Sequence, residues 1–298
     1  MTTQDYRPLP DALNEAGAFA KPMPGPIEPP KDLPPEFAQR AEREEAEKQA
    51  RLPYAELFQS GQASYGGITM PYRLYVPDTQ PGKRYPLVVF LHGGGERGDD
   101  NLLPLIANDG ALIWVKDQLE GGGEACFVLA AQCPAEGFGW MQDHLLVCSA
   151  ALDTVIAGYP IDEDRLYLTG MSMGGGGCWR MNYLFPDRFA AVVPMCSAAC
   201  IARPGEVDQV GVGQAADAFV GKPLWIIHAA DDFVVSPETS RSLVRALEAR
   251  GQVRDRDFYY TEYPAVCGYN HACWDPAYAD PTLRRWLFKQ SLQTPAQG

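Results

Sequence analysis

Two patterns of hydrophobic and polar residues run along the chain, and the difference between them predicts the fold. Residues 68–76 alternate apolar and polar side chains, as a strand with one solvent-exposed face does. Residues 85–91 are apolar without a break, which indicates a strand covered on both faces. Further apolar, strand-like runs lie at 126–131, 165–169, 189–195, 224–228 and 258–262.

Helical segments separate these runs, the clearest at 143–157, 178–185 and 237–250. Strands that alternate with helices imply right-handed βαβ units, so we expect a mostly parallel, doubly wound α/β sheet flanked by helices. There is no internal repeat and no second glycine-rich strand-turn-helix segment. The sequence therefore predicts one catalytic-sized domain at residues 55–298.

The first 54 residues have a different composition and are expected to form a proline-rich arm and a charged helix. Nine of the 26 prolines fall within residues 1–35, which excludes a helix interior or a central strand there. Residues 36–50 are good helix formers with little apolar stripe, which indicates a solvated helix. An alternative is that arm and helix pack across a partner subunit, giving a homodimer.

Charge and composition exclude several classes of partner. The net charge of −13 and the pI of about 4.7 oppose binding to nucleic acid or other polyanions. No apolar run is long enough to span a membrane, and the polar start lacks the layout of a signal peptide. We therefore expect a cytoplasmic protein, or a periplasmic or secreted one if a signal was removed.

The eight cysteines show no metal-binding spacing, and most are expected to be small buried residues. Cys267 and Cys273 bracket one loop, so they are the pair to test for a disulfide.

A single serine, Ser172, lies between Gly170 and Gly174 in a G-x-S-x-G pattern. An apolar run precedes it and a helical segment follows, so the pattern predicts a nucleophile elbow, a sharp strand-to-helix turn that exposes the hydroxyl. The alternative is a glycine-rich turn with an incidental serine. Of the four glycines at 174–177, one or two suffice for close packing, and the others should cost helix stability.

A serine nucleophile needs a base, and the chain has four histidines. His92 and His228 directly follow apolar runs and His144 lies in an amphipathic helix, so these three suit structural roles. His271 lies in a loop between the last strand-like run and the terminal helix, where catalytic residues are common. We predict His271 as the base, with a loop-packing histidine as the alternative.

The acid that orients the base should lie between serine and histidine in the chain. Asp231 and Asp232 follow the run 224–228, at the carboxyl end of a strand, where open α/β sheets place their sites. Position alone leaves both aspartates open.

An oxyanion hole requires backbone N–H groups aimed at the developing negative charge. The glycines that follow His92 offer such amides, and Gly94 together with the amide of Met173 is the preferred pair. Gly93 and Gly95 remain open as donors, and a glycine turn without function is the alternative.

Four stretches resemble the α/β-hydrolase-fold serine esterases. They resemble most the branch with prolyl-oligopeptidase-like and phospholipase/carboxylesterase-like enzymes, feruloyl and acetyl xylan esterases, and polyhydroxybutyrate depolymerases. The stretches are Leu91-His-Gly-Gly-Gly-Glu-Arg-Gly98 with Asp100 and Asn101, Gly170-Met-Ser-Met-Gly-Gly-Gly-Gly-Cys-Trp179 continuing to Phe185-Pro-Asp-Arg-Phe189, His228 to Val235, and His271-Ala-Cys-Trp274 with Ala277 and Tyr278. The resemblance runs from about residue 62 to the C-terminus.

The resemblance selects one of the two aspartates. Such families carry H-G-x-x-D-x-x-V-P, in which the aspartate four residues after the histidine completes the triad, and Asp232 occupies that position. Ala229 and Ser236 depart from the glycine and the proline of the pattern. The resemblance implies that Ser172 attacks an ester carbonyl, with His271 as base and then acid, and that no metal or organic cofactor is needed.

Residues beside the predicted triad are candidates for the substrate cleft: Glu96, Arg97, Trp140 and Trp274. Arg97 could bind a substrate carboxylate or pair with Glu96. Trp179 is expected to pack beneath the elbow.

The leading hypothesis is a carboxylic ester hydrolase for small, aromatic or sugar-linked acyl esters. A peptidase or amidase, or a depolymerase of polyesters or polyamides, would use the same triad. A catalytically silent hydrolase fold that binds a ligand or a protein is the third possibility. Acyl group, leaving group and the choice between monomer and polymer stay open.

Overall fold

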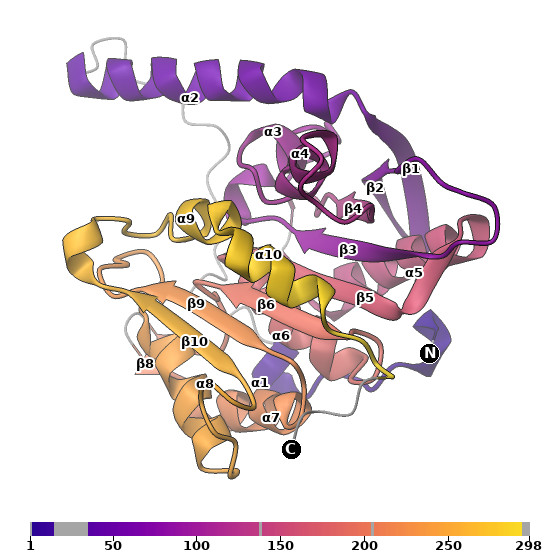
Figure 1. The fold of residues 1–298 in the computed structure, drawn as a ribbon. Helices are drawn as coiled ribbons and strands as arrows, with labels where there is room; N and C mark the ends of the chain where they lie inside the picture. Colours follow the sequence, from indigo (N-terminus) through magenta and orange to yellow (C-terminus); the bar gives the residue numbers. More distant parts are fainter. Residues whose placement is uncertain (1, 15–34, 137–138, 204–205, 294–298) are drawn as a thin grey trace.

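An eight-stranded sheet forms the centre of the molecule, in the order β1-β2-β4-β3-β5-β6-β9-β10 (Figure 1). The computed structural model describes residues 2–14, 35–136, 139–203 and 206–293. β2 pairs antiparallel with β1 and β4, and all other neighbours in the sheet are parallel. The strands are β1 (Phe58–Tyr65), β2 (Ile68–Tyr75), β3 (Tyr85–Leu91), β4 (Phe127–Ala131), β5 (Ile161–Met171), β6 (Ala191–Met195), β9 (Trp225–Ala229) and β10 (Tyr259–Tyr263), and a separate small ribbon joins β7 (Ile201–Arg203) to β8 (Glu206–Val207).

Strand β3 shows why the unbroken apolar runs predicted the centre of the sheet correctly. All seven of its residues are buried. Leu87, Val89 and Leu91 point into the hydrophobic core on one face of the sheet, and Val88 and Phe90 point into the core on the other. Because side chains alternate between the two faces, a strand covered on both sides must be apolar at every position.

Helices cover both faces, which confirms the expected doubly wound sheet. The first core is closed by α1 (Asp11–Asn14), α5 (Gln142–Gly158), α6 (Met173–Leu184), α7 (Gln209–Phe219) and α8 (Glu238–Glu248). The second is closed by α3 (Leu103–Ile106), α4 (Ile113–Leu119), α9 (Trp274–Ala279) and α10 (Pro281–Phe288) (Figure 1). None of the helices in the described part of the chain is long and apolar enough to cross a membrane.

Strand β1 and helices α3 and α4 could not be predicted from the pattern of apolar and polar residues. Strand β1 reads Phe-Gln-Ser-Gly-Gln-Ala-Ser-Tyr and buries only two of its eight residues, since it lies at the edge of the sheet. Helices α3 and α4 have four and seven residues, too few to show a helical period.

The described residues at the start of the chain, 2–14, pack against the domain. Leu13 is 1% exposed, and its carbonyl accepts a hydrogen bond from Arg180 Nε of α6 at 2.6 Å. Thr3 N donates to Asp153 Oδ2 of α5 at 2.8 Å. The proline-rich residues 15–34 lie outside the described residues, so the arm and the domain boundary at residue 54 stay predictions.

The predicted charged helix is α2 (Pro35–Ala55), and it extends beyond the expected end at residue 50. Its residues 42–47 are exposed, while Arg51 in the last turns donates to Asp109 at 3.1 Å. In Figure 1 the helix projects along one end of the molecule. A partner subunit on this helix stays a prediction.

The cysteines, all of which lie in described residues, are free thiols, and Cys267 alone is exposed. The expectation of small buried cysteines is thus confirmed. The suggested pair does not form: Cys273 is buried, and its thiol contacts Cys196 rather than Cys267.

All four glycines at the start of α6 are required by close packing, so the expectation that one or two suffice is wrong. A Cβ atom added at any of them would come within 3.0 Å of a neighbouring atom. These contacts are Gly174 to Leu91 O at 1.9 Å, Gly175 to Met195 O at 2.3 Å, Gly176 to Ala198 O at 2.2 Å, and Gly177 to Trp140 Cβ at 2.8 Å. The glycines lower the helix propensity of α6, but they let the helix lie directly against three backbone carbonyls and the side chain of Trp140.

Replacing Gly174 with alanine should therefore lower the free energy of unfolding by about 3 kcal/mol or more, since the methyl group meets backbone that cannot rotate away. Gly213→Ala in α7 is the matched control, because the nearest atom to its added Cβ is Arg250 Nη2 at an ordinary 3.6 Å. That variant should be neutral or gain up to about 1 kcal/mol. Urea denaturation of both compares them, and equal effects would refute the close-packing argument.

Candidate active site

Ser172 lies at the sharp turn between β5 and α6, as the elbow pattern predicted. Its backbone has φ 55° and ψ −117°, a conformation that costs a non-glycine residue about 1–3 kcal/mol. The surrounding backbone holds it there: Ser172 N donates to Met195 O, and Ala198 N donates to Ser172 O, both at 2.9 Å. The strain keeps a half-buried hydroxyl at the carboxyl edge of the sheet.

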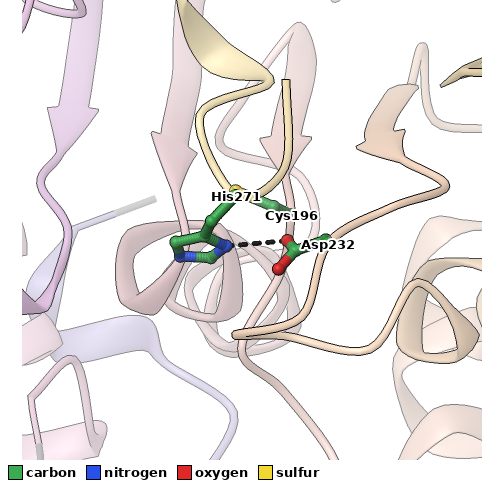
Figure 2. A group of neighbouring side chains, drawn as sticks. All are labelled: Cys196, Asp232 and His271. Atoms are coloured by element: carbon green, nitrogen blue, oxygen red, sulfur yellow. Dashed lines mark hydrogen bonds and ion pairs between the residues drawn. The ribbon is translucent and has the colours of Figure 1, made fainter. Parts of the chain in front are cut away.

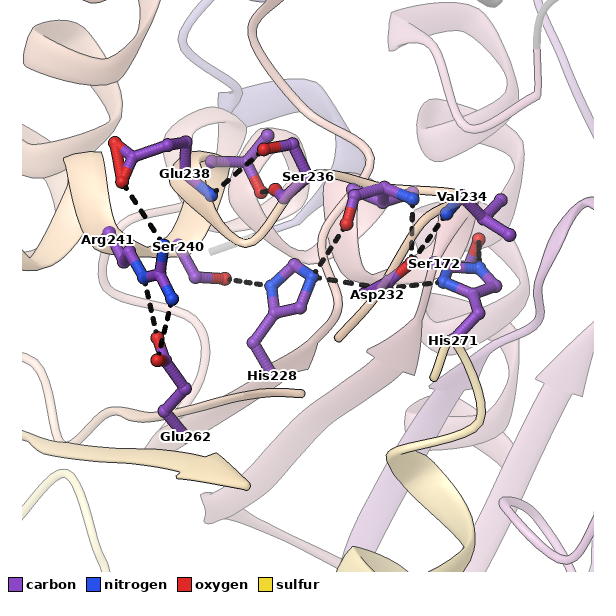
Figure 3. Close-up of polar contacts among 12 residues, drawn as sticks. Ser172, His228, Asp232, Val234, Ser236, Glu238, Ser240, Arg241, Glu262 and His271 are labelled. Carbon is purple, nitrogen blue, oxygen red and sulfur yellow. Dashed lines mark hydrogen bonds and ion pairs between the residues drawn. The ribbon is translucent and has the colours of Figure 1, made fainter. Parts of the chain in front are cut away.

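The structure brings Ser172, His271 and Asp232 together in one hydrogen-bonded row (Figure 3). His271 Nε2 is 2.8 Å from Ser172 Oγ, and His271 Nδ1 is 2.7 Å from Asp232 Oδ2. A carboxylate can only accept, so Nδ1 carries the proton and the lone pair of Nε2 faces the serine hydroxyl. The ring of Trp274 packs edge-on against His271, with centroids 5.2 Å apart.

The carboxylate of Asp232 accepts four hydrogen bonds. Oδ1 takes the amides of Val234 and Val235 at 2.9 Å each, and Oδ2 takes His271 and also His228 Nε2 at 3.1 Å. Burial raises the pKa of this carboxyl, but the hydrogen bonds from the two histidines and from the backbone outweigh burial and hold the pKa well below its usual range. Asp232 is thus an anion at neutral pH.

The neighbouring Asp231 does not take part in this row. Its Oδ1 is buried and has no hydrogen-bond partner among the described residues. The structure therefore distinguishes the two aspartates that sequence position left open, and Asp232 is the one that meets His271.

The predicted oxyanion loop follows β3 and lies against the elbow. Gly94 begins a short 3-10 turn, η3 (Gly94–Glu96), and Met173 begins α6. N–H groups in the first turn of a helix have no partner within the helix, so both positions suit a donor to a ligand. Arg97 Nε donates to Gly94 O at 3.1 Å, which fixes the turn from outside. The role of these two amides stays a prediction.

His92 holds the base of this loop. Its Nδ1 lies 2.6 Å from Gly93 O and its Nε2 accepts the Cys133 amide at 2.9 Å, which defines a neutral ring with the proton on Nδ1. Burial lowers the pKa of His92 to about 4. The indole of Trp140 packs edge-on to the ring at 5.0 Å and donates to His92 O at 2.9 Å.

Two residues that were predicted to line the cleft, Glu96 and Trp140, have buried side chains. Trp140 has no exposed surface, and Glu96 is 8% exposed with Oε1 accepting from Asn108 Nδ2 at 3.1 Å. Burial raises the pKa of Glu96. The sequence marks both as close to the site, but their burial depends on distant segments of the chain. Arg97 and Trp274 are half-buried and remain candidates for substrate contact.

Cys196 is a neighbour of the row that sequence reasoning missed. Its sulfur, an Asp232 oxygen and a His271 nitrogen lie within 4.8 Å of one another (Figure 2). This donor set could hold a thiophilic metal ion, but Asp232 and His271 already share a hydrogen bond at 2.7 Å. The thiol is buried against Cys273, and burial raises its pKa well above the usual range. Cys196 therefore lies buried beside Asp232 and His271.

The mostly parallel sheet, the strand-turn-helix elbow and the row of serine, histidine and aspartate define an α/β-hydrolase fold. Residues 70–246 match the model of the esterase PHB depolymerase family, and the chain belongs to that family. No curated protein matches the chain.

Solved structures share the fold. A thermostable esterase is 37% identical with a TM-score of 0.67, and the alignment covers 80% of this chain and 64% of that one. A ferulic acid esterase is 15% identical with a TM-score of 0.59, covering 78% and 98% of the two chains. A putative dipeptidyl aminopeptidase IV from Bacteroides ovatus is 16% identical with a TM-score of 0.59, covering 78% and 36%. The chain thus spans less than two thirds of the thermostable esterase and about a third of the aminopeptidase.

The neutral state of His92 should make stability depend on pH. In the unfolded chain this histidine binds a proton below about pH 6.5, whereas in the folded protein it stays neutral down to about pH 4. Stability is therefore lost as pH falls through this window, by on the order of 3 kcal/mol in total. His92→Asn, which can keep the donor to Gly93 O, should show a flatter dependence in urea denaturation between pH 7 and 4.5. Equal slopes in the two proteins would contradict this origin.

Proposed function

We propose that the protein is a serine hydrolase that cleaves carboxylic esters through Ser172, His271 and Asp232. The observation that carries the proposal is the continuous hydrogen-bonded row from Ser172 Oγ through His271 to Asp232 Oδ2, with distances of 2.8 and 2.7 Å. The family and the similarity to a thermostable esterase support the reaction class.

Acylation begins when Ser172 Oγ attacks the ester carbonyl carbon and its proton moves to His271 Nε2. The imidazolium forms next to the ionised Asp232, which stabilises its charge and keeps its Nδ1 proton in place. The carbonyl oxygen becomes an oxyanion that accepts hydrogen bonds from the amides of Gly94 and Met173. His271 then donates the proton to the leaving alcohol, and an acyl-enzyme remains.

Deacylation repeats these steps with water. His271 Nε2 removes a proton from a water molecule, which attacks the acyl carbonyl, and the same two amides bind the second oxyanion. Collapse returns the proton to Ser172 Oγ and releases the acid. The neutral His92 beneath the loop keeps the donor geometry constant, because its Nδ1 and Nε2 hold Gly93 O and Cys133 N.

Apolar side chains on the two loops that carry Asp232 and His271 favour an ester with an apolar or aromatic group. Phe233, directly after Asp232, is 80% exposed, and Val266, five residues before His271, is 92% exposed. We propose small, aromatic or sugar-linked acyl esters as substrates. A polymer substrate is the alternative that the family description supports.

Ser172→Ala should lower hydrolysis of p-nitrophenyl acetate by about four orders of magnitude or more, because no other hydroxyl takes its place at the elbow. Ser64→Ala on the edge strand β1 is the matched control and should keep full activity. A fluorophosphonate probe should label the wild type and leave Ser172→Ala unlabelled. Full activity in Ser172→Ala rejects the mechanism, and a folded wild type that does not label supports a binding protein.

The acid is tested by two isosteric changes at adjacent positions. Asp232→Asn should lower kcat about 10⁴-fold, since the amide favours the wrong tautomer of His271, and Asp231→Asn should stay near wild type. The reverse result would transfer the role to Asp231. Matched ester and anilide substrates, measured on the wild type, separate an esterase from a peptidase or amidase.

A further inference from the structure

His228 is a fully buried histidine that the proposed mechanism does not use. It lies on β9, four residues before Asp232, and has no exposed surface. Figure 3 shows its ring on the side of Asp232 away from His271. The sequence suggested only a structural role, because the residue directly follows apolar positions.

The contacts of the ring place a proton on Nε2. Nε2 lies 3.1 Å from Asp232 Oδ2 and 3.0 Å from Val235 O, and both oxygens can only accept. The proton is therefore on Nε2. Nδ1 lies 2.8 Å from Ser240 Oγ of α8, and the serine hydroxyl can donate to its lone pair. Each polar atom of this buried ring has a partner.

The Nε2–H group of His228 thus contacts both ends of a tight turn. Asp232 begins the turn and Val235 ends it, and Asp232 Oδ1 already accepts the amides of Val234 and Val235. Those two amides fix Oδ1, while His228 and His271 share Oδ2. Without His228, the carboxylate would keep its position through Oδ1 but could rotate about that contact.

We propose that His228 is a positioning residue of the active site, which holds Asp232 Oδ2 in line with His271 Nδ1 and is itself oriented by Ser240. This inference rests on the proposed function of the Ser172 row. His228 is then the second histidine that contacts the carboxylate of Asp232. The hydrogen bonds form one continuous chain, which runs through Ser240, His228, Asp232, His271 and Ser172. His228 acts through Asp232 and touches no reacting atom.

His228→Leu keeps the approximate volume of the side chain but removes the donor. It should lower kcat about 10- to 100-fold, because misplacement of a catalytic group by a fraction of an ångström has effects of this size. KM should change less than about threefold, since His228 does not face the substrate. His228→Gln, whose amide N–H can reach the position of Nε2, should restore most of kcat.

Proton NMR gives a readout that does not need turnover. The downfield resonance of the proton between His271 Nδ1 and Asp232 should shift or broaden in His228→Leu and return in His228→Gln. The measurement is repeated in a Ser172→Ala background, so it still reports on Asp232 if the proposed nucleophile is wrong. Failure of the proposed function and failure of this inference are therefore separable.

Arg241→Gln is the matched control. Arg241 follows Ser240 in α8 and binds Glu262 of β10 through two hydrogen bonds of 2.8 Å, a pair that does not contact Asp232 (Figure 3). It should keep wild-type kcat and the wild-type resonance.

A folded His228→Leu with kcat within about threefold of wild type and an unchanged resonance overturns the proposal, as does a folded His228→Gln that is equally impaired. If His228→Leu does not fold, Ser240→Ala tests the proposal instead, because it removes the contact to Nδ1 of His228 and keeps the Nε2 donor. A several-fold loss of kcat with unchanged KM supports the proposal, and wild-type kcat overturns it.

Discussion

A carboxylate has room for about four hydrogen bonds, and Asp232 accepts four. Two come from the backbone of its own turn, one from β9 and one from the loop after β10. The position of His271 therefore depends on how three segments of the chain meet at one side chain. A change in any of these segments alters the direction of Oδ2, and through His271 it alters the contact with Ser172 Oγ.

Two buried imidazoles that carry a proton on different nitrogens pack beside the site. His92 carries its proton on Nδ1 and orders the glycine loop, and His228 carries its proton on Nε2 and orders the acid turn. In each ring the neighbouring acceptors determine which nitrogen is protonated. A third imidazole, His271, is the one with access to solvent, and it is half-buried.

The central strands could be predicted because their signal is local: a strand buried on both faces is apolar at each position. The elbow and the order of serine, aspartate and histidine could be predicted from short motifs. What the sequence could not supply depends on contacts between distant segments. Glu96 and Trp140 were recognised as near the site but not as buried beneath it. Three of the four glycines of α6 are explained by carbonyls of other strands and loops, and Gly177 is explained by the side chain of Trp140.

Those glycines also bear on the order of folding. A twelve-residue helix with four adjacent glycines has little tendency to form alone, since each costs about 1 kcal/mol relative to alanine. Helix α6 packs against β3, β5 and β6, and because it depends on these contacts we expect it to form only once the strands have assembled. The strained turn at Ser172 leads directly into α6, so we expect the turn to form late as well. A partly folded chain would then contain a serine of ordinary reactivity, and the proposed nucleophile would be active only in the completed protein.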